Sequence, residues 1–322
     1  MTDYRDLLPV AHEAVDIARD LMRTLQPGVL TAKGDRDMAS EVDYAIEQRV
    51  RDYLAAKTPD IGFLGEEEGS SGRTDGLVWA LDPVDGTVNF IHGLPLCAVS
   101  LGLIDRQHAV LGIIDLPFLG DRYSAARGQG AYADGERIRA SRVADLRDAV
   151  VAIGDYAVGA GAQQKNAQRL AITDHLVQRV QRVRMIGSAA IDLAWLAHGR
   201  VDAFVMLANK PWDTAAGVVI AQEAGARVVD QDGSTHSTAA TATIAAGPAI
   251  LQPVVALVEQ ALTDVVESRI GNRTTRPHGL PAEVSNDLAD PHCHVLRTCT
   301  AVLCAEQSGH LGLATGSGPW VS

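Results

Sequence analysis

The sequence predicts a fold of layered sheets and helices, of the α/β (α+β) class. Three observations support this prediction. Two helical patterns open the chain and are followed by a series of strand-like runs, as in an α+β fold. From about residue 145, short apolar runs alternate with helical patterns, which is typical of an α/β layer. A length of 322 residues is enough for one large domain or two smaller ones with a real core.

The first two elements are predicted to be helices. Residues 4–25 carry apolar side chains at helical spacing, and Pro9 places the start of this helix near itself, since proline is tolerated in a first turn. A second helix is expected from Ser40 to about Ala56. Ser40 can cap it, and Asp43 occupies the capping-box position.

The middle of the chain reads as strands. Apolar runs bounded by turn residues occupy 61–65, 78–81, 97–105, 109–116 and 122–140. The last of these contains Gly128-Gln129-Gly130, which lacks the third glycine and the following helix of a dinucleotide-binding motif.

The second half alternates strands and helices. Strands are expected at 149–154, 182–186, 201–207, 227–230 and 242–246, and helices at 165–181, 188–198, 214–225 and 250–265. We therefore expect an N-terminal α+β half over residues 1–145 and a C-terminal α/β half over 146–267.

Residues 268–322 differ in composition, with many Thr, Ser, Gly, His and Pro residues, and we expect a poorly ordered appended tail. The tail contains three of the four cysteines of the chain, together with two histidines (Cys293, Cys299, Cys304, His292 and His294). Their spacing is not that of a usual zinc finger or ribbon, so a zinc site is not favoured.

The net charge of −12 argues against nucleic acid and an anionic membrane surface as partners. No apolar run reaches the ~20 residues needed to cross a bilayer. The first residues lack a basic segment followed by an apolar core, so no signal peptide is expected and a cytoplasmic location is predicted. Four cysteines, only Cys97 of them before the tail, do not make a disulfide framework.

Two carboxylates three positions apart end the strand-like run at 78–81. Pro83 turns the backbone between Asp82 and Asp85, so both side chains can converge on one point. Gly86 permits close approach to a ligand, and Thr87 begins a helical turn whose free N–H groups suit an anion. Carboxylates beside an anion site indicate a Mg²⁺-dependent phosphate site. An EF-hand is excluded because the loop has no Asp/Asn ladder and no closing Glu.

Two further stretches place acids after apolar runs. Glu66-Glu67-Glu68 follows the run at 61–65, and Asp213 begins the helical pattern at 214–225. The simpler readings are a solvated charge run, and an N-cap at Asp213. Both are weakened because a carboxylate next to an apolar run is costly to place without a partner.

With these stretches in view, the chain resembles the inositol monophosphatase family over about residues 5–265. The motifs that carry the resemblance are Gly65-Glu66-Glu67, Asp82-Pro83-Val84-Asp85-Gly86-Thr87-Val88-Asn89-Phe90 and Trp212-Asp213-Thr214-Ala215-Ala216-Gly217. The resemblance implies a layered αβαβα sandwich of the inositol monophosphatase and fructose bisphosphatase type.

The resemblance also implies roles. Glu66, Asp82 and the carbonyl of Val84 would hold a first Mg²⁺, and Asp82, Asp85 and Asp213 a second, with a third, weaker ion near Glu66. Thr87, hydrogen-bonded to Asp43, would position the attacking water. The N–H groups of Gly86 and Thr87 would bind the phosphate. Glu67 and Lys33 would lie next to the metal ligands without binding the metal themselves.

For the alcohol part of the substrate, the resemblance points to Ser188 and Ala189, and to the position of Met206, where inositol-cleaving members carry Glu. It implies a Mg²⁺-dependent, lithium-sensitive phosphatase and homodimer that acts on a small phosphorylated polyol, foremost myo-inositol 1-phosphate. Histidinol phosphate, a nucleotide 3′-phosphate and fructose 1,6-bisphosphate stay open as substrates. Outside enzymes, a catalytically silent regulator and an anion-binding protein without turnover also stay open.

Overall fold

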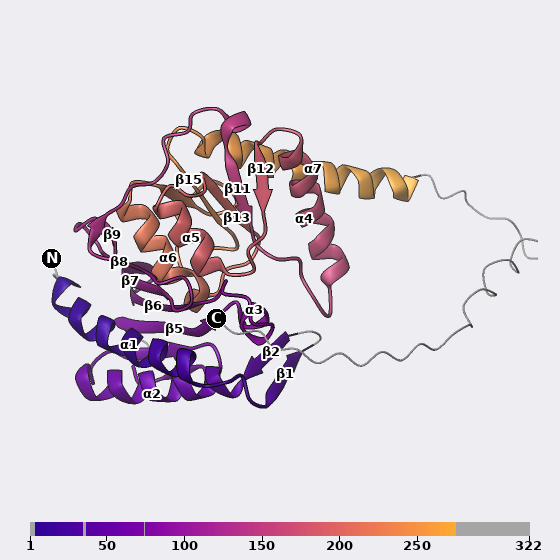
Figure 1. Cartoon of the computed structure of the whole chain (residues 1–322). Helices are drawn as coiled ribbons and strands as arrows, with labels where there is room; N and C mark the ends of the chain where they lie inside the picture. Colours follow the sequence, from indigo (N-terminus) through magenta and orange to yellow (C-terminus); the bar gives the residue numbers. More distant parts are fainter. Residues whose placement is uncertain (1–3, 35–36, 74, 275–322) are drawn as a thin grey trace, which may run out of the picture. The chain divides into compact units, whose positions relative to one another are not determined.

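The computed structural model describes residues 4–34, 37–73 and 75–274. They belong to one compact unit, Met1–Thr275, and the predicted tail from residue 275 onward lies outside the described residues, as do its cysteines and histidines. Within this unit, helices and sheets alternate in five layers (Figure 1). α1 and α2 cover one face of an eight-stranded sheet, α5 and α6 lie between that sheet and a five-stranded one, and α4 and α7 cover the far side. The expected αβαβα sandwich is confirmed.

The first layer is built from the two N-terminal helices. A short 3-10 helix, Tyr4–Leu7, leads into α1 (Leu8–Thr24), with Pro9 in its first turn as expected. α2 (Glu41–Lys57) is capped by Ser40, and the predicted capping box with Asp43 is present. Between the helices lies a hairpin of β1 (Leu30–Gly34) and β2 (Asp37–Ser40), which the sequence pattern did not indicate.

The eight-stranded sheet has the order β10-β9-β8-β7-β6-β5-β3-β4. β3 and β5 are parallel, and the other neighbouring pairs are antiparallel. The strands are β3 (Gly62–Gly65), β4 (Ser70–Ser71), β5 (Leu77–Asp85), β6 (Ala98–Asp105), β7 (His108–Leu116), β8 (Asp121–Ala126), β9 (Ala131–Ala133) and β10 (Glu136–Arg137). The parallel pair brings the ends of β3 and β5 to the same edge.

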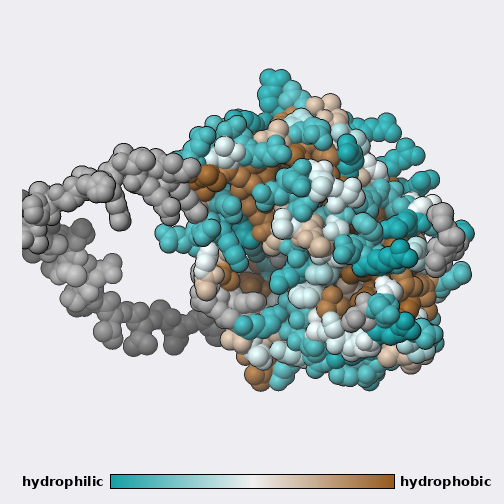
Figure 2. Space-filling view, turned by 180° about the vertical axis from the view of Figure 1, so that it is seen from behind, coloured by the Kyte–Doolittle hydropathy of each residue, from teal (hydrophilic) through white to brown (hydrophobic). Residues whose placement is uncertain are grey.

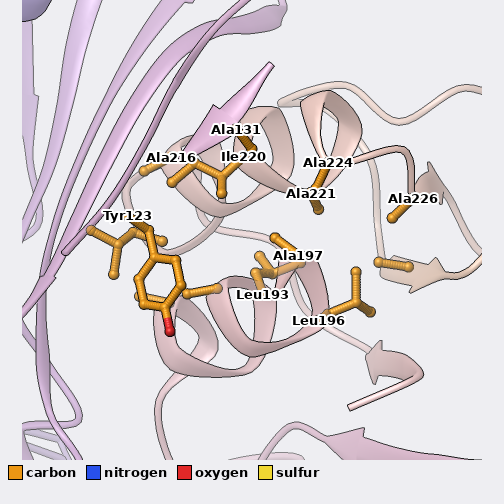
Figure 3. Close-up of a cluster of buried hydrophobic side chains, with 14 of the residues drawn as sticks. Tyr123, Ala131, Leu193, Leu196, Ala197, Ala216, Ile220, Ala221, Ala224 and Ala226 are labelled. Atoms are coloured by element: carbon orange, nitrogen blue, oxygen red, sulfur yellow. The ribbon is translucent and has the colours of Figure 1, made fainter. Parts of the chain in front are cut away.

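The middle layer consists of α5 (Ala189–Ala197) and α6 (Pro211–Glu223). Figure 3 shows side chains of both helices gathered in one apolar cluster with Tyr123 of β8. α6 lies directly on the sheet, because a Cβ added at Gly112 would stand 2.5 Å from the carbonyl oxygen of Ala216. The same holds at Gly102, where an added Cβ would meet the Ala215 side chain at 2.7 Å.

The five-stranded sheet has the order β12-β11-β13-β15-β14. Its strands are β11 (Val150–Ile153), β12 (Arg182–Arg184), β13 (Ala203–Met206), β14 (Arg227–Val229) and β15 (Thr243–Ala246), preceded by a 3-10 turn, Leu146–Asp148. The outer layer is formed by α4 (Ala162–Val177) and α7 (Leu251–Thr274).

Three helices in this half, α4, α6 and α7, have boundaries that differ from the expected ones by several residues. α4 begins three residues earlier and ends four residues earlier than the expected range of 165–181, and Gly161 occupies its N-cap position. α7 continues to Thr274 rather than ending at 265, so residues 268–274 are helical and not part of an irregular tail.

The surface of the described part is mixed. Seen from behind, hydrophilic residues cover most of it, and hydrophobic ones form smaller patches between them (Figure 2). Among the described residues, no helix combines the length and apolar character that crossing a bilayer requires.

Candidate active site

The turn after β5 brings its carboxylates into a tight arrangement. Asp82 Oδ1 accepts a hydrogen bond from the N–H of Val84 at 3.1 Å, and the pairing of β5 with β6 becomes irregular between Asp82 and Asp85. Gly86 then adopts a φ of +87°, and a Cβ there would lie 2.9 Å from the carbonyl oxygen of Leu96. Glycine is therefore required on both conformational and steric grounds. α3 (Thr87–Ile91) follows immediately.

Three carboxylates from distant parts of the chain converge at this edge. Glu66 follows β3, Asp82 lies near the end of β5 and Asp213 lies in the first turn of α6, and one oxygen of each lies within 4.8 Å of the others. Burial raises the pKa of Asp82 well above its usual range, and the nearby charges of Glu66, Asp85 and Asp213 raise it further. Crowded buried carboxylates are costly without a compensating cation.

Asp213 reaches the cluster because α6 begins earlier than expected. Lys210 occupies the N-cap position, so the reading of Asp213 as the N-cap of a helix at 214–225 is wrong. The Ser100 hydroxyl of β6 donates to the carbonyl of Trp212 at 3.2 Å, which ties the start of α6 to the sheet. Burial, followed by the charges of Asp85 and Glu66, raises the pKa of Asp213 well above its usual range.

Asp85 lies beside the three-carboxylate cluster and links it to α5. Its Oδ2 accepts hydrogen bonds from the Ser188 hydroxyl and, at 2.7 Å, from the N–H of Ala190. Ser188 also caps α5, because its hydroxyl oxygen accepts a hydrogen bond from the N–H of Ile191 at 3.2 Å. Burial raises the pKa of Asp85 to about 6.

Asp43 and Thr87 meet as the resemblance implied. The Thr87 hydroxyl lies 3.3 Å from Asp43 Oδ1 and 2.9 Å from the carbonyl oxygen of Val84. Asp43 Oδ2 accepts from the N–H and the hydroxyl of Ser40, which is the capping box. Asp43 is fully buried, and it both caps α2 and contacts Thr87.

Lys33 and Glu67 stand next to Glu66. The Lys33 ammonium donates to Glu66 Oε1 at 2.7 Å and to Glu67 Oε1 at 2.9 Å. Burial opposes the charge of Lys33, but these two carboxylates outweigh it and raise its pKa. Burial also raises the pKa of Glu67 to about 7, and its Oε2 has no hydrogen-bond partner among the described residues.

Glu47 is a residue of the site that the sequence analysis missed. It is fully buried on α2, and its two oxygens accept from the N–H groups of Glu67 at 2.8 Å and Glu68 at 2.9 Å. A Cβ at Gly65 would stand 2.2 Å from the Glu47 carboxyl group, so glycine at 65 makes room for it. Helical spacing alone gives no sign of this carboxylate.

The loop before α5 is the stretch for which the resemblance implied alcohol recognition. Gly187 has a φ of +80°, and Asn89 Nδ2 holds the loop by donating to the carbonyl of Ile186 at 2.9 Å. Ala189 is the first residue of α5. Met206, at the end of β13, is half-buried and packs against the apolar cluster that contains Phe204, and it also lies against Gly154.

The donor set fits a hard divalent cation. All three clustered side chains offer carboxylate oxygens, and the shared burial and mutual repulsion would be relieved by a cation between them. Oxygen-only ligands favour Mg²⁺, Ca²⁺ or Mn²⁺ over metals that prefer nitrogen or sulfur.

Comparison with known proteins agrees with this site. The family model described as "Inositol monophosphatase family" matches residues 3–263. The chain is 34% identical over 232 residues to a fructose-1,6-bisphosphatase/inositol-1-monophosphatase of Thermotoga maritima, covering 72% of this chain and 86% of the relative. It is 35% identical over 237 residues to the Nus factor SuhB of Escherichia coli, covering 73% and 87%.

Among solved structures, the IMPase of Thermotoga maritima superposes with a TM-score of 0.73 at 30% identity, covering 81% of this chain and 99% of that one. A family match over most of the chain, the layered fold and the converging carboxylates agree, and the chain belongs to the inositol monophosphatase family of metal-dependent phosphatases.

Proposed function

We propose that this chain hydrolyses myo-inositol 1-phosphate, or a close polyol phosphate, with two to three Mg²⁺ ions in each active site. The observation that carries the proposal is the convergence of Glu66, Asp82 and Asp213 within 4.8 Å, beside Asp85 and the Asp43–Thr87 pair. The names of the relatives support a substrate of this class, since they include inositol-1-monophosphatase and fructose-1,6-bisphosphatase.

The metal would be held by side chains already in position. Glu66, Asp82 and the carbonyl of Val84 would hold one ion, and Asp82, Asp85 and Asp213 another, with a weaker third near Glu66. Bound Mg²⁺ would supply positive charge that activates water and stabilises the phosphoryl oxygens. Lys33 adds a further positive charge next to Glu66, and Glu67 orients it.

Thr87 would orient the attacking water. Its single hydroxyl proton is directed at Asp43 or at the carbonyl of Val84, both of which can only accept. The oxygen of Thr87 therefore keeps lone pairs free to accept a hydrogen bond from the water. The N–H groups of Gly86 and Thr87 would receive the phosphate oxygens.

The alcohol would lie against the loop at Gly187, Ser188 and Ala189. Met206 offers no strong acceptor to a ring hydroxyl, so selectivity for inositol should be modest. Its packing beside Phe204 favours the alternative in which it does not meet substrate. Histidinol phosphate, a nucleotide 3′-phosphate and fructose 1,6-bisphosphate are therefore the competing substrates.

The test is phosphate release from a panel of these esters, measured with and without Mg²⁺. We expect turnover that requires Mg²⁺, is inhibited by Li⁺ and is lost in Asp82→Asn, while Asp148→Asn, an exposed aspartate elsewhere, keeps wild-type rates. Substantial turnover by Asp82→Asn at saturating Mg²⁺ would refute the ligand assignment. Met206→Glu decides whether Met206 meets substrate. A selective rise in kcat/KM for inositol 1-phosphate would place Met206 at the alcohol, whereas an unchanged ranking of the substrates would remove it from the alcohol site.

A second candidate is a regulator without turnover, because one relative carries the name Nus factor SuhB. The complete acid set favours catalysis, since a silent protein does not need crowded buried carboxylates. We further propose a cytoplasmic homodimer, which light scattering coupled to size exclusion would test.

A further inference from the structure

A second cavity lies outside the carboxylate site. It has a volume of about 180 Å³ and lies between the β6–β7 turn, one side of α6 and the segment before β15. The polar residues that line it are Gln107, His108, Arg127, Thr214, Gln222, Thr235, His236, Ser237 and Thr238. None of the residues assigned to metal, phosphate or alcohol above lines it.

The lining favours an anion. Arg127 is its fixed positive charge, and Arg127 Nη2 donates to the carbonyl oxygen of Ala109 at 3.0 Å, which holds the guanidinium at the wall. Among the described residues that line the cavity, none is acidic, although the chain carries a net charge of −12. Gln107 and Gln222 add amide N–H donors.

His236 gives the cavity an acceptor as well. Burial lowers the pKa of His236 to about 4, so the ring is neutral at pH 7. Its Nε2 lies 3.0 Å from the Thr243 hydroxyl, which in turn lies 3.5 Å from Asn209 Oδ1, an atom that can only accept. Nε2 therefore carries the proton, which leaves Nδ1 as an acceptor for a ligand hydroxyl.

The cavity is connected to the start of α6 by hydrogen bonds. Asn209 Oδ1 accepts from Thr214 at 2.7 Å, and the same Thr214 lines the cavity and follows Asp213 directly. Asn209 Nδ2 donates to the carbonyl oxygens of Ser237 and Thr238, which also line the cavity. A ligand that displaces Thr238 or Thr214 would therefore also displace the start of α6, where Asp213 lies.

We propose that this cavity binds a small hydroxylated anion, a carboxylate or phosphate of about ten non-hydrogen atoms, and that its occupancy changes the affinity of the carboxylate site for Mg²⁺. The anionic group would meet Arg127 and the glutamine amides, and a hydroxyl would donate to His236. The binding claim stands without the proposed function, whereas the effect on Mg²⁺ rests on it.

The binding test uses calorimetry on the full chain freed of metal with a chelator, so that the carboxylate site does not attract anions. The probes are glycerate and glycerol 3-phosphate, which separate a carboxylate from a phosphate source, with glycerol as the uncharged comparison. We expect one of the anions to bind and glycerol not to. Arg127→Gln should weaken binding at least about ten-fold, because a charge-assisted hydrogen bond is lost.

Two further variants guard against a folding effect. Gln222→Trp leaves Arg127 in place but fills the cavity from an exposed position on α6, and it should abolish binding. Arg142→Gln, an exposed arginine outside the cavity, should bind as the wild type does. Equal binding by all variants, or no binding of either anion, would overturn the proposed site.

The coupling is measured as the Mg²⁺ midpoint of phosphate release. Free Mg²⁺ is titrated once without glycerate and once with saturating glycerate. We expect a shift of at least about two-fold in the wild type and none in Gln222→Trp. A midpoint that glycerate leaves unchanged, with binding intact, would overturn the coupling but not the site.

Discussion

At the scale of single residues, Glu47 determines where the backbone places Glu66. Its carboxylate accepts both N–H groups of Glu67 and Glu68 in a fully buried position. Glu47→Ala leaves these donors unsatisfied, at a cost of about 1–3 kcal/mol for each buried group. We expect a lower free energy of unfolding and a higher Mg²⁺ requirement, measured by denaturant titration and by the Mg²⁺ midpoint of activity.

Glu47→Gln is the matched variant, because its amide keeps one acceptor oxygen and should give an intermediate effect. Arg49→Ala, exposed on the same helix, should change neither quantity. An unchanged Mg²⁺ midpoint in Glu47→Ala would show that Glu66 holds its position without this support.

His236 supplies a prediction about pH. Burial lowers its pKa to about 4 from an ordinary value of 6.5, so between these values the unfolded chain binds a proton that the folded chain does not. Its contribution to stability is therefore complete above pH 6.5 and is lost as the pH falls towards 4, by up to about 3 kcal/mol. The free energy of unfolding is measured for the wild type and for His236→Gln from pH 7 to 4.5. The wild-type value minus the variant value should fall as the pH falls, and a constant difference would contradict the prediction.

Local sequence patterns identify each of the clustered acids, but they do not identify the residues that hold those acids in place. Glu66, Asp82 and Asp213 each lie at the end of an apolar run or the start of a helical pattern, where an unpaired carboxylate is conspicuous. Glu47 lies inside an amphipathic helix, where glutamate is ordinary on the solvent side. Its burial depends on Gly65, a residue from another element, so no local pattern reveals it.

At the scale of elements, the close packing of α6 against the eight-stranded sheet determines the position of Asp213. An added Cβ at Gly112 would lie 2.5 Å from the Ala216 carbonyl oxygen and 2.6 Å from its Cα, both backbone atoms that cannot rotate away. We expect Gly112→Ala to cost about 1–3 kcal/mol through overpacking and to lower kcat by displacing α6. Thermal unfolding and kcat at saturating Mg²⁺ measure the two effects.

Gly120→Ala separates strain from displacement. Gly120 has a φ of +81° but no neighbour within 4 Å of an added Cβ, so it should lose about 1–2 kcal/mol of stability and keep kcat. If Gly112→Ala also kept kcat, the position of α6 would not control the carboxylate site.

The identities of the helices and most strands follow from periodicity, but their ends follow from tertiary contacts. α6 begins at Pro211, with Lys210 at the N-cap position and the Trp212 carbonyl bonded to Ser100, so Asp213 lies inside the first turn and is not a cap. The β1–β2 hairpin lacks the alternating apolar pattern that predicts strands, because few of its side chains are buried.

At the scale of the whole molecule, the succession of helix and strand patterns predicts an α+β half followed by an α/β half, whereas the order of the five layers was implied by the family resemblance. The pairing of β3 parallel to β5, which brings Glu66 beside Asp82, joins residues through a crossover that no local signal specifies. The boundary between the two halves near residue 145 stays a prediction, and Met1–Thr275 forms one compact unit.

The same unit defines where the chain can be shortened. The family match ends at residue 263, and α7 continues to Thr274, so the cut belongs after 274 rather than after 267. Every residue of the proposed site and of the second cavity lies before it. Deleting residues 275–322 should therefore leave the melting temperature within about 2 °C of the full chain and kcat/KM unchanged, because the cut lies at the end of the compact unit and after every residue to which a role is assigned. Differential scanning calorimetry and phosphate release on both proteins decide the matter. A lower melting temperature would mean that the removed segment packs on the unit, and a lower kcat/KM at an unchanged melting temperature would mean that it completes the site.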